Sequence, residues 1–278
     1  MKICQVHAVY FSPTGTTRTV VTCITQTIAA LLSGVEETVL DFTLPVRRQE
    51  GVVSFHPSEL VVVGLPVYAG RLPNLLLRYL SSFSGGGAWA VPVVLFGNRS
   101  YGNALTELRD ILEKSGFHTI GAAAFVGQHS FSEKLAQGRP DADDLVFARK
   151  FANGIVEKVN LLLPEDKLSP IEVPGKGAPD YGGYYKPLND MGEVVNMLKV
   201  KPVTTDACIR CRRCASVCPL GSIDPQDVAQ VSGICIKCNA CVKICPVQAK
   251  KWLDESYLGH LRFLEQNYIS RMSAEFFL

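Results

Sequence analysis

The stretch "CIRCRRCASVCP", residues 208–219, is followed by "CIKCNACVKICP", residues 235–246. Each copy places cysteines at relative positions 0, 3, 6 and 10 and closes with Cys-Pro. Gaps of two residues let a short, turning backbone point three thiolates at one iron–sulfur cube, and the fourth cysteine lies too far along the chain to complete the same site. The repeat therefore predicts two [4Fe–4S] clusters, with the ligands Cys208, Cys211, Cys214, Cys218, Cys235, Cys238, Cys241 and Cys245.

Zinc and disulfide bonds explain this repeat less well. Zinc takes four cysteines as two pairs and needs neither a third cysteine at the same gap nor a trailing proline. A disulfide framework does not fit the N-terminus "MKICQVHAVYF", which lacks the long apolar stretch of a signal peptide. A purely structural role for the clusters stays open, although two clusters close together make a natural route for single electrons.

Residues 200–250 resemble a bacterial two-cluster ferredoxin through this repeat. The resemblance implies that the fourth cysteine of each copy ligates the other cluster. One cluster then takes Cys208, Cys211, Cys214 and Cys245, and the other takes Cys235, Cys238, Cys241 and Cys218. Such a crossing holds a small α+β domain together through its metals rather than through a large core.

The cysteine segment is basic, whereas the chain as a whole is nearly neutral. Residues 200–253 hold 8 Lys and Arg against 3 Asp and Glu, a net charge of +5, in a chain of net charge +2. Two interpretations of this basic segment stay open. The charges form an ordinary solvated surface, or they favour the reduced form of the clusters or steer an acidic redox partner. Seven of these eight basic residues lie among the ligands: Arg210, Arg212, Arg213, Lys237, Lys243, Lys250 and Lys251.

The first part of the chain alternates Val-rich apolar runs with helical patterns. Short apolar runs bounded by Gly, Pro or Ser are typical of strands buried on both faces. We expect strands at 3–11, 35–42, 60–65, 91–97 and 119–127, with helices between them at 17–32, 73–83, 103–115 and 141–162. Five strands with interleaved helices predict an α/β fold with a doubly wound parallel sheet.

Composition divides the chain into four parts. Residues 163–187 are rich in Pro and Gly without a sustained period, which indicates a linker or an extended arm. We expect a first domain at 1–165, a linker at 166–199, the cluster domain at 200–253 and a C-terminal helix at 254–278. The helix carries an apolar stripe for core or inter-domain packing rather than for docking a partner.

The stretch "YFSPTGTTRTV", residues 10–20, follows the first expected strand and opens the first expected helix. Hydroxyls, a tight glycine turn and the free amides at the start of a helix favour an anion. The loop lacks the lysine of a Walker A sequence and the three glycines of a dinucleotide loop. It therefore suits one phosphate monoester, bound by Ser12, Thr14, Gly15, Thr16 and Thr17.

Two further loops are expected beside this phosphate loop. In a sheet of order 2-1-3-4-5, the ligand crevice lies at the carboxyl ends of strands 1, 3 and 4. "PVYAGRLP" (66–73) and "GNRSYGNAL" (97–105) follow the third and fourth strands and offer aromatic rings and backbone amides. The set suits FMN, with the isoalloxazine between the two loops, and the expected contacts are Pro66, Val67, Tyr68, Ala69, Gly70, Gly97, Asn98, Tyr101, Gly102 and Asn103.

Residues 1–162 resemble a flavodoxin, because "SPTGTT" (12–17) matches that family's phosphate loop, with Thr16 where Asn is commoner. The whole chain resembles the single-chain flavodoxin–ferredoxin fusions found mostly in anaerobes. Flavodoxins often stack an aromatic ring on the flavin, which makes Tyr68 and Tyr101 candidates, although either ring also suits packing. His129 and Ser130, after the fifth strand, lie near the same rim, where a buried hydrogen-bonding histidine is expected rather than a catalytic one.

The expected function is electron transfer, with single electrons relayed between two [4Fe–4S] clusters and a flavodoxin-type FMN. We expect redox partner proteins, a cytoplasmic location, no nucleic acid and no membrane span, because no run of about eighteen apolar residues occurs. No residue set indicates a nucleophile or general base, so no catalytic residue is named. Two alternatives stay open: a flavin-dependent reductase of a small molecule that is fed by the clusters, and a redox sensor whose flavodoxin-like domain is empty.

Overall fold

The first domain is built on a parallel sheet with the strand order β2–β1–β3–β4–β6. The computed structural model describes residues 3–49, 51–162 and 169–278. The strands are β1 (Gln5–Tyr10), β2 (Glu36–Asp41), β3 (Glu59–Pro66), β4 (Trp89–Phe96) and β6 (Ala122–Val126), and a short β5 (His118–Thr119) also pairs with β4. This is the order of a flavodoxin-like sheet, so the predicted order 2-1-3-4-5 is confirmed, with β6 as the fifth strand.

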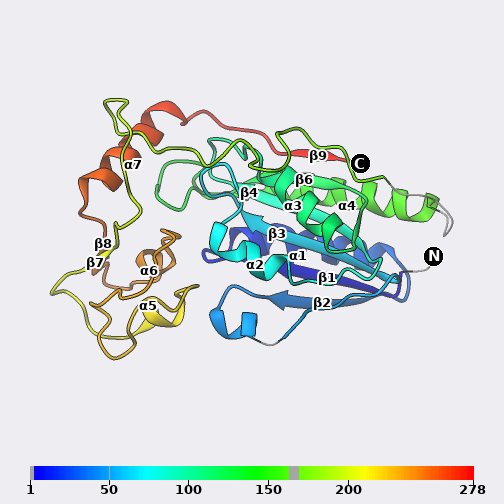
Figure 1. Ribbon diagram of the computed structural model, residues 1–278, viewed down its shortest axis with the longest axis horizontal. Helices are drawn as coiled ribbons and strands as arrows, with labels where there is room; N and C mark the ends of the chain where they lie inside the picture. Colours follow the sequence, from blue (N-terminus) through cyan, green and yellow to red (C-terminus); the bar gives the residue numbers. More distant parts are fainter. Residues whose placement is uncertain (1–2, 50, 163–168) are drawn as a thin grey trace.

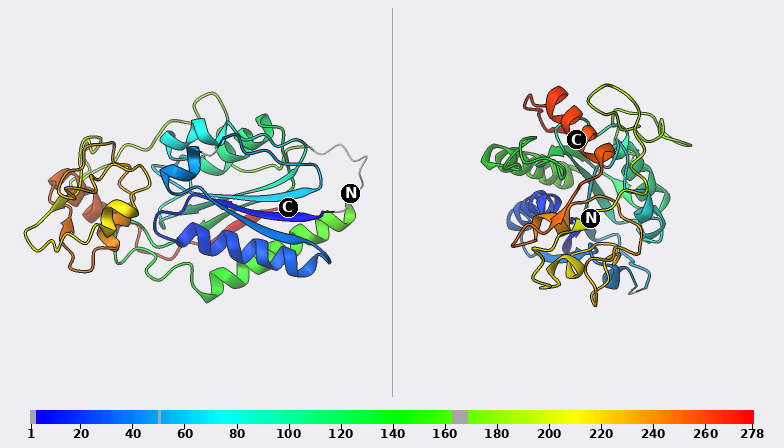
Figure 2. Two further views of the ribbon diagram at one scale, coloured as in Figure 1. Left: turned by 90° about the horizontal axis from the view of Figure 1, so that it is seen from below. Right: turned by 90° about the vertical axis from the view of Figure 1, so that its left-hand side faces the viewer.

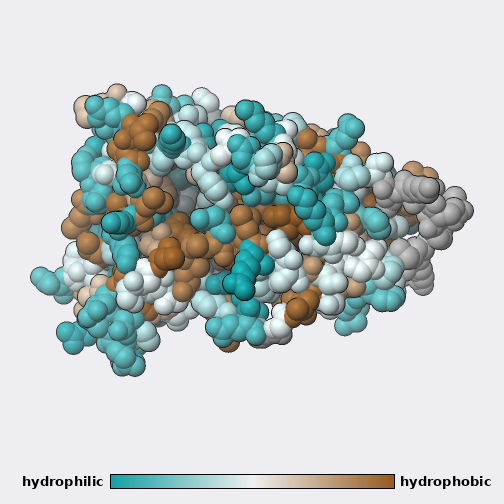
Figure 3. Space-filling model, in the orientation of Figure 1, coloured by the Kyte–Doolittle hydropathy of each residue, from teal (hydrophilic) through white to brown (hydrophobic). Residues whose placement is uncertain are grey.

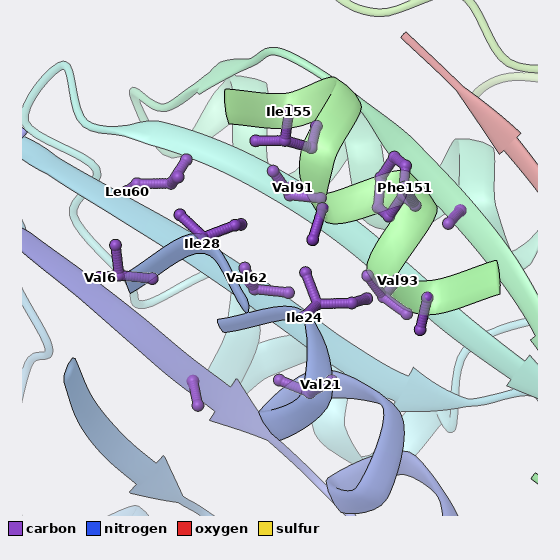
Figure 4. Close-up of a cluster of buried hydrophobic side chains, with 14 of the residues drawn as sticks. Val6, Val21, Ile24, Ile28, Leu60, Val62, Val91, Val93, Phe151 and Ile155 are labelled. Atoms are coloured by element: carbon purple, nitrogen blue, oxygen red, sulfur yellow. The ribbon is translucent and has the colours of Figure 1, made fainter. Parts of the chain in front are cut away.

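Helices cover both faces of the sheet (Figure 2). On one face α1 (Thr16–Leu31) and α4 (Ala142–Leu161) pack on β3 and β4, which are buried almost throughout. Figure 4 shows Ile24 and Ile28 of α1 and Phe151 of α4 directed at the valines of these strands. The other face carries α3 (Ala104–Lys114) and a second apolar cluster.

The helix expected at 73–83 is only partly formed. A 3₁₀ turn (η2, Asn74–Leu76) leads into a single α-helical turn, α2 (Leu77–Leu80). The three serines and three glycines within the residues that follow, 81–87, do not sustain a helix. Another 3₁₀ turn, η1 (Pro45–Gln49), follows β2.

The end of the chain returns to the first domain. Helix α7 (Glu255–Asn267) is followed by β9 (Glu275–Phe277), which pairs antiparallel with β6 at the edge of the sheet. The expectation of one helix over 254–278 is therefore wrong beyond Asn267. The physical reason is packing, since the ring of Phe276 lies 5.3 Å from that of Phe151 in α4 and completes the core there.

The described part of the expected linker, residues 169–199, begins as an arm held against the first domain and continues along α7 and the small domain. Residues 163–168 lie outside the described residues. Ile171 is buried in the core beside α3. The guanidinium of Arg71 lies 4.8 Å from the ring of Tyr181 and 4.9 Å from that of Tyr184. The hydroxyl of Tyr184 donates to the carbonyl of Leu72 at 2.9 Å.

The small domain lies beyond the carboxyl ends of the parallel strands (Figure 1). It contains two one-turn helices, α5 (Arg213–Ser216) and α6 (Ala240–Lys243), and an antiparallel pair, β7 (Val203–Thr204) with β8 (Lys250–Lys251). One of its apolar clusters is small and contains cysteines: Cys241 is buried with Ile223 and Val228, and Cys208, Cys214 and Cys218 pack against them. Within the described ranges, no helix has the length and apolar character that crossing a membrane requires.

Candidate functional site

The eight repeat cysteines line two separate cavities of the small domain. The first cavity is lined by Cys208, Cys211, Cys214 and Cys245. The second is lined by Cys218, Cys235, Cys238 and Cys241. Each cavity thus collects three cysteines of one copy and the last cysteine of the other, which is the crossed grouping that the sequence predicts.

In each set the four thiols line a cavity and do not converge on one central point. Among residues 3–49, 51–162 and 169–278, no three His, Cys, Asp or Glu side chains come together closely enough to hold one metal ion. A zinc ion would draw its sulfurs to about 2.3 Å from its centre, so the arrangement does not fit zinc. Four thiols around a cavity fit the larger cube of a [4Fe–4S] cluster.

Backbone amides point at several of these sulfurs. The amide of Ser222 donates to Sγ of Cys218 at 3.3 Å, and that of Ala249 donates to Sγ of Cys245 at 3.1 Å. Such donors stabilise the negative charge that thiolate ligands carry and tune the potential of the cluster that they hold.

A crevice opens at the carboxyl edge of the sheet, where the first domain meets the small domain. Its lining comes from the loops after β1, β3, β4 and β6 and from one cysteine: Pro13, Thr14, Thr16, Thr17, Pro66, Val67, Tyr68, Leu95, Phe96, Gly97, Gly127, Gln128, His129, Ser130 and Cys238. Cys238 also lines the second cysteine cavity. One side chain therefore forms a wall common to the crevice and to that cavity.

The loop before α1 is built to accept an anion. Gly15 has φ +89°, which favours glycine, and it begins α1 without any side-chain cap. The amides of Thr16 and Thr17 are thus left for a ligand, beside the hydroxyls of Thr14 and Thr16 in the crevice. Ser12 and Gly15 do not line the crevice, because the Ser12 hydroxyl accepts from the amide of Arg18 at 3.0 Å and Gly15 makes the turn.

Part of the expected flavin site lies elsewhere. The structure places Ala69, Gly70, Asn98, Tyr101, Gly102 and Asn103 outside the lining of the crevice. The amide nitrogen of Asn98 donates to the carbonyls of Tyr268 and Ser270, at 2.6 and 2.8 Å. The Tyr101 hydroxyl donates to Glu275 at 2.8 Å.

These residues anchor the chain segments that fold over their loop. The Asn103 side chain donates to the carbonyl of Tyr181 and accepts from the amide of Lys176. The amide of Tyr185 donates to the carbonyl of Ala69 at 2.9 Å. The loop 97–105 is therefore covered by the arm and by the chain end, and beyond Gly97 it does not reach the crevice.

The opposite side of the crevice comes from residues 127–130, which follow β6. The expected rim residues His129 and Ser130 lie here, whereas Gln128 and Gly127 were not expected. Their position after the last parallel strand is the signal that could have identified them. Nδ1 of His129 accepts from the amide of Phe131 at 3.1 Å, so a hydrogen on the neutral ring sits on Nε2.

The electrostatics of the crevice keep its polar rings neutral. Burial lowers the pKa of His129 to about 3, and the neighbouring His260 and Lys243 add to this effect. Burial, with Cys238 and Cys235 nearby, raises the pKa of Tyr68 well above its ordinary value. Both side chains therefore offer a hydrogen-bond donor at neutral pH.

Family comparisons identify the small domain. Residues 201–224 and residues 232–248 each match a model described as a 4Fe–4S binding domain. The chain joins a flavodoxin-like domain to a 4Fe–4S binding domain. The two matched ranges contain all eight cysteines of the cavities. None of the curated proteins matches the sequence of this fused chain.

Several solved structures resemble the flavodoxin-like domain. A flavodoxin from the domain Archaea is 17% identical, with a TM-score of 0.41, over 56% of this chain and 99% of that chain. The Streptococcus pneumonia TIGR4 flavodoxin is 16% identical, with a TM-score of 0.39, over 56% and 99%. An NADH:FMN oxidoreductase is 17% identical, with a TM-score of 0.43, over 58% and 92%. The fold assignment depends on the strand order of this chain and not on these scores.

Proposed function

We propose that this protein transfers single electrons between two [4Fe–4S] clusters in the small domain and an FMN in the crevice. The observation that carries the proposal is the position of Cys238, which lines both the crevice and the second cysteine cavity. A cofactor in the crevice would be separated from a cluster in that cavity by one side chain, that of the ligand Cys238. When bound, FMN accepts one or two electrons, and each cluster passes one.

The residues of the crevice fit the two ends of FMN. The uncapped start of α1 and the hydroxyls of Thr14, Thr16 and Thr17 would hold the phosphate. Tyr68 and His129 would line the ring system and donate hydrogen bonds to it, since both are neutral. Leu95 and Phe96 close the floor of the crevice and keep water from it.

The order of the two cysteine sets supports a relay. The set that contains Cys238 lies against the flavodoxin-like domain, and Cys238 and Cys241 are buried. The other set contains Cys211, which is exposed to solvent. Electrons would thus exchange with partners at the outer set and with the crevice through the inner set.

Metal and flavin analysis of one anaerobic preparation tests the proposal. We expect about eight irons per chain, from two four-iron clusters, with matching sulfide and one FMN. Replacing Cys218 by Ala should remove the cluster next to the crevice, and replacing Cys245 should remove the outer one. Cys23→Ala, outside both cavities, serves as the control and should keep all iron. Full iron content in Cys218→Ala would refute the crossed ligand sets.

A steady-state assay separates this function from a reductase. A reductase that the clusters feed would turn over a quinone, a nitro compound or a pyridine nucleotide with saturation. An electron carrier would exchange electrons with proteins and artificial dyes alone. An anaerobic preparation with full iron and no flavin would point to the redox sensor instead.

A further inference from the structure

The two ligand loops have the same cysteine spacing but different surroundings. In the inner loop, Asn239 is buried, donates to the hydroxyl of Tyr257 at 2.8 Å and accepts from the indole of Trp252. Lys237 donates to the carbonyls of Leu198 and Cys235. The rest of the protein therefore closes this loop.

The outer loop is open at the corresponding positions. Arg210 and Arg212 replace Lys237 and Asn239, and they are exposed together with Arg213. None of the three guanidinium groups makes a hydrogen bond or ion pair to any other described residue. Three unpaired positive charges thus surround Cys211, the exposed member of the outer cysteine set.

Apolar side chains line the outer cavity together with Arg212 and Arg213. Ile209 is 62% exposed and Val247 is 38% exposed, and both line the outer cavity beside Cys211. Figure 3 shows hydrophobic residues reaching the surface in the half of the molecule that holds the small domain. An apolar centre with a charged rim is typical of a protein interface, and the rim charge governs the rate of association.

We propose that Ile209, Val247 and the three arginines form a docking surface for an acidic one-electron carrier protein. This inference rests on the proposed function, and it names where electrons cross to a partner and the charge of that partner. The partner would present carboxylates around its own exposed cofactor. Transfer moves one electron from a reduced cluster to the oxidised partner, or the reverse, with no bond made or broken.

Stopped-flow exchange with an acidic plant-type ferredoxin tests the surface. The wild-type rate constant should fall steeply with ionic strength. The triple variant Arg210→Glu, Arg212→Glu, Arg213→Glu should be at least tenfold slower at low salt and should lose this salt dependence. The control carries the same charge change on the flavodoxin-like domain, at the exposed residues Arg78, Lys114 and Lys150, and should stay within twofold of the wild type.

The outcomes separate the docking surface from the proposed function. Equal rates for the triple variant and the wild type, with full iron in both, would refute the surface. So would an equal loss in the control. If the wild type reduces iron(III)–EDTA but not the ferredoxin, the surface is refuted and the electron-transfer function stands. If it reduces neither, both fail.

A buried lysine carries a second, independent inference. Lys250 is 2% exposed, and its ammonium donates to the Thr204 hydroxyl and to the carbonyl of Val228, each at 2.5 Å. Within the described residues it forms no ion pair with a carboxylate. A buried charge without a counter-charge is costly.

Ligand segments of both cysteine sets lie beside this lysine. Lys250 lines the outer cavity together with Cys214. Its strand, β8, packs against α6, which carries Cys241 of the inner set. The missing counter-charge is therefore supplied by the negative clusters that the two cavities hold under the proposed function. We infer that Lys250 is a positioning charge that stabilises the reduced state of the clusters.

An EPR-monitored redox titration of the purified holoprotein tests this role. In Lys250→Met, the ratio of reduced to oxidised cluster at a fixed potential should fall about tenfold for at least one cluster, which is ~59 mV for one electron. Lys250→Arg should restore it, and the exposed neighbour change Lys251→Met should leave it unaltered. Unchanged potentials in Lys250→Met with full iron would refute the inference. If Lys250→Met does not fold, Lys250→Gln takes its place. A change in the ratio of reduced to oxidised cluster that is equally large in Lys250→Arg and Lys250→Gln would then refute the inference, because arginine keeps the charge. A wild type without iron would instead refute the proposed function.

Discussion

The ring of Phe131 packs against the ring of Tyr257, with their centroids 4.7 Å apart. Phe131 belongs to the loop after β6, next to the crevice, and Tyr257 lies in α7, which follows the cysteine segment. Tyr257 stacks on Trp252 at 4.1 Å and is 1% exposed. This contact joins the flavodoxin-like domain to the small domain beside the common wall of their two sites.

Replacing Phe131 by Ala should loosen the junction. Truncating an aromatic ring in a packed cluster costs about 3 kcal/mol, and we expect about 2 kcal/mol here because Phe131 is half-buried. Urea unfolding measures the loss, and electron exchange between cluster and flavin should slow in parallel. Phe131→Leu keeps most of the packing and should lose less than half as much. Unchanged stability in the Ala variant would show that the ring contact is incidental.

Removing the Thr16 hydroxyl should weaken the binding of FMN, because it removes a contact with the phosphate. The hydroxyl lines the crevice at the uncapped start of α1. Loss of one hydrogen bond to a charged phosphate costs about 1.5 kcal/mol, so the FMN dissociation constant of Thr16→Val should rise about tenfold in a fluorescence titration. Riboflavin, which has no phosphate, should bind both proteins equally. Thr19→Val is the control, because that hydroxyl donates to the carbonyl of Gly15 and lies outside the crevice.

The stability of the protein should fall in mild acid partly because of His129. Its folded pKa of about 3 lies below the ordinary 6.5. The unfolded state therefore binds more protons between these values, and stability is lost as pH falls through 6.5. Between pH 7.5 and 5.5 the wild type should lose about 1 kcal/mol more than His129→Gln. Urea unfolding at the two pH values gives this difference, and parallel losses in both proteins would contradict it.

The buried pair Arg71–Glu107 should hold the arm on the flavodoxin-like domain. Glu107 accepts from Nε of Arg71 at 2.8 Å and from the amide of Leu72 at 2.9 Å. Glu107→Gln leaves a buried guanidinium without a counter-charge, at a cost of about 3 kcal/mol. Trypsin should then cut the arm faster at Lys176 and Lys186.

Glu255→Gln provides the comparison for Glu107→Gln. The Arg262–Glu255 ion pair lies on the exposed face of α7, so its loss should leave cleavage of the arm unchanged. Equal cleavage rates in the two variants would show that the buried pair has no special role in holding the arm.

Local features of the sequence predicted most of the site. The cysteine spacing acts over ten residues, and the loop from Ser12 to Thr17 joins one strand to the next helix. Both patterns constrain neighbouring backbone directly, so their geometry follows from the chain itself. Tyr68 also lines the crevice, because it comes directly after a buried strand whose end is set by the parallel sheet.

The tertiary structure decided what covers that site. Asn98 and Tyr101 are residue types that suit flavin contacts. Their side chains instead form hydrogen bonds with the end of the chain, 170 and 174 positions away. An amide and a phenol can contact a flavin or anchor a chain segment, and the return of residues 268–277 to β6 selects the second role. The repeat by itself indicated that eight cysteines serve two clusters. The crossed sets stay a prediction, which the lining of the two cavities supports. Which set faces the crevice, and that Cys238 forms the common wall, depended on how two domains pack, because contacts between distant segments are set by burial across the whole chain and not by local spacing.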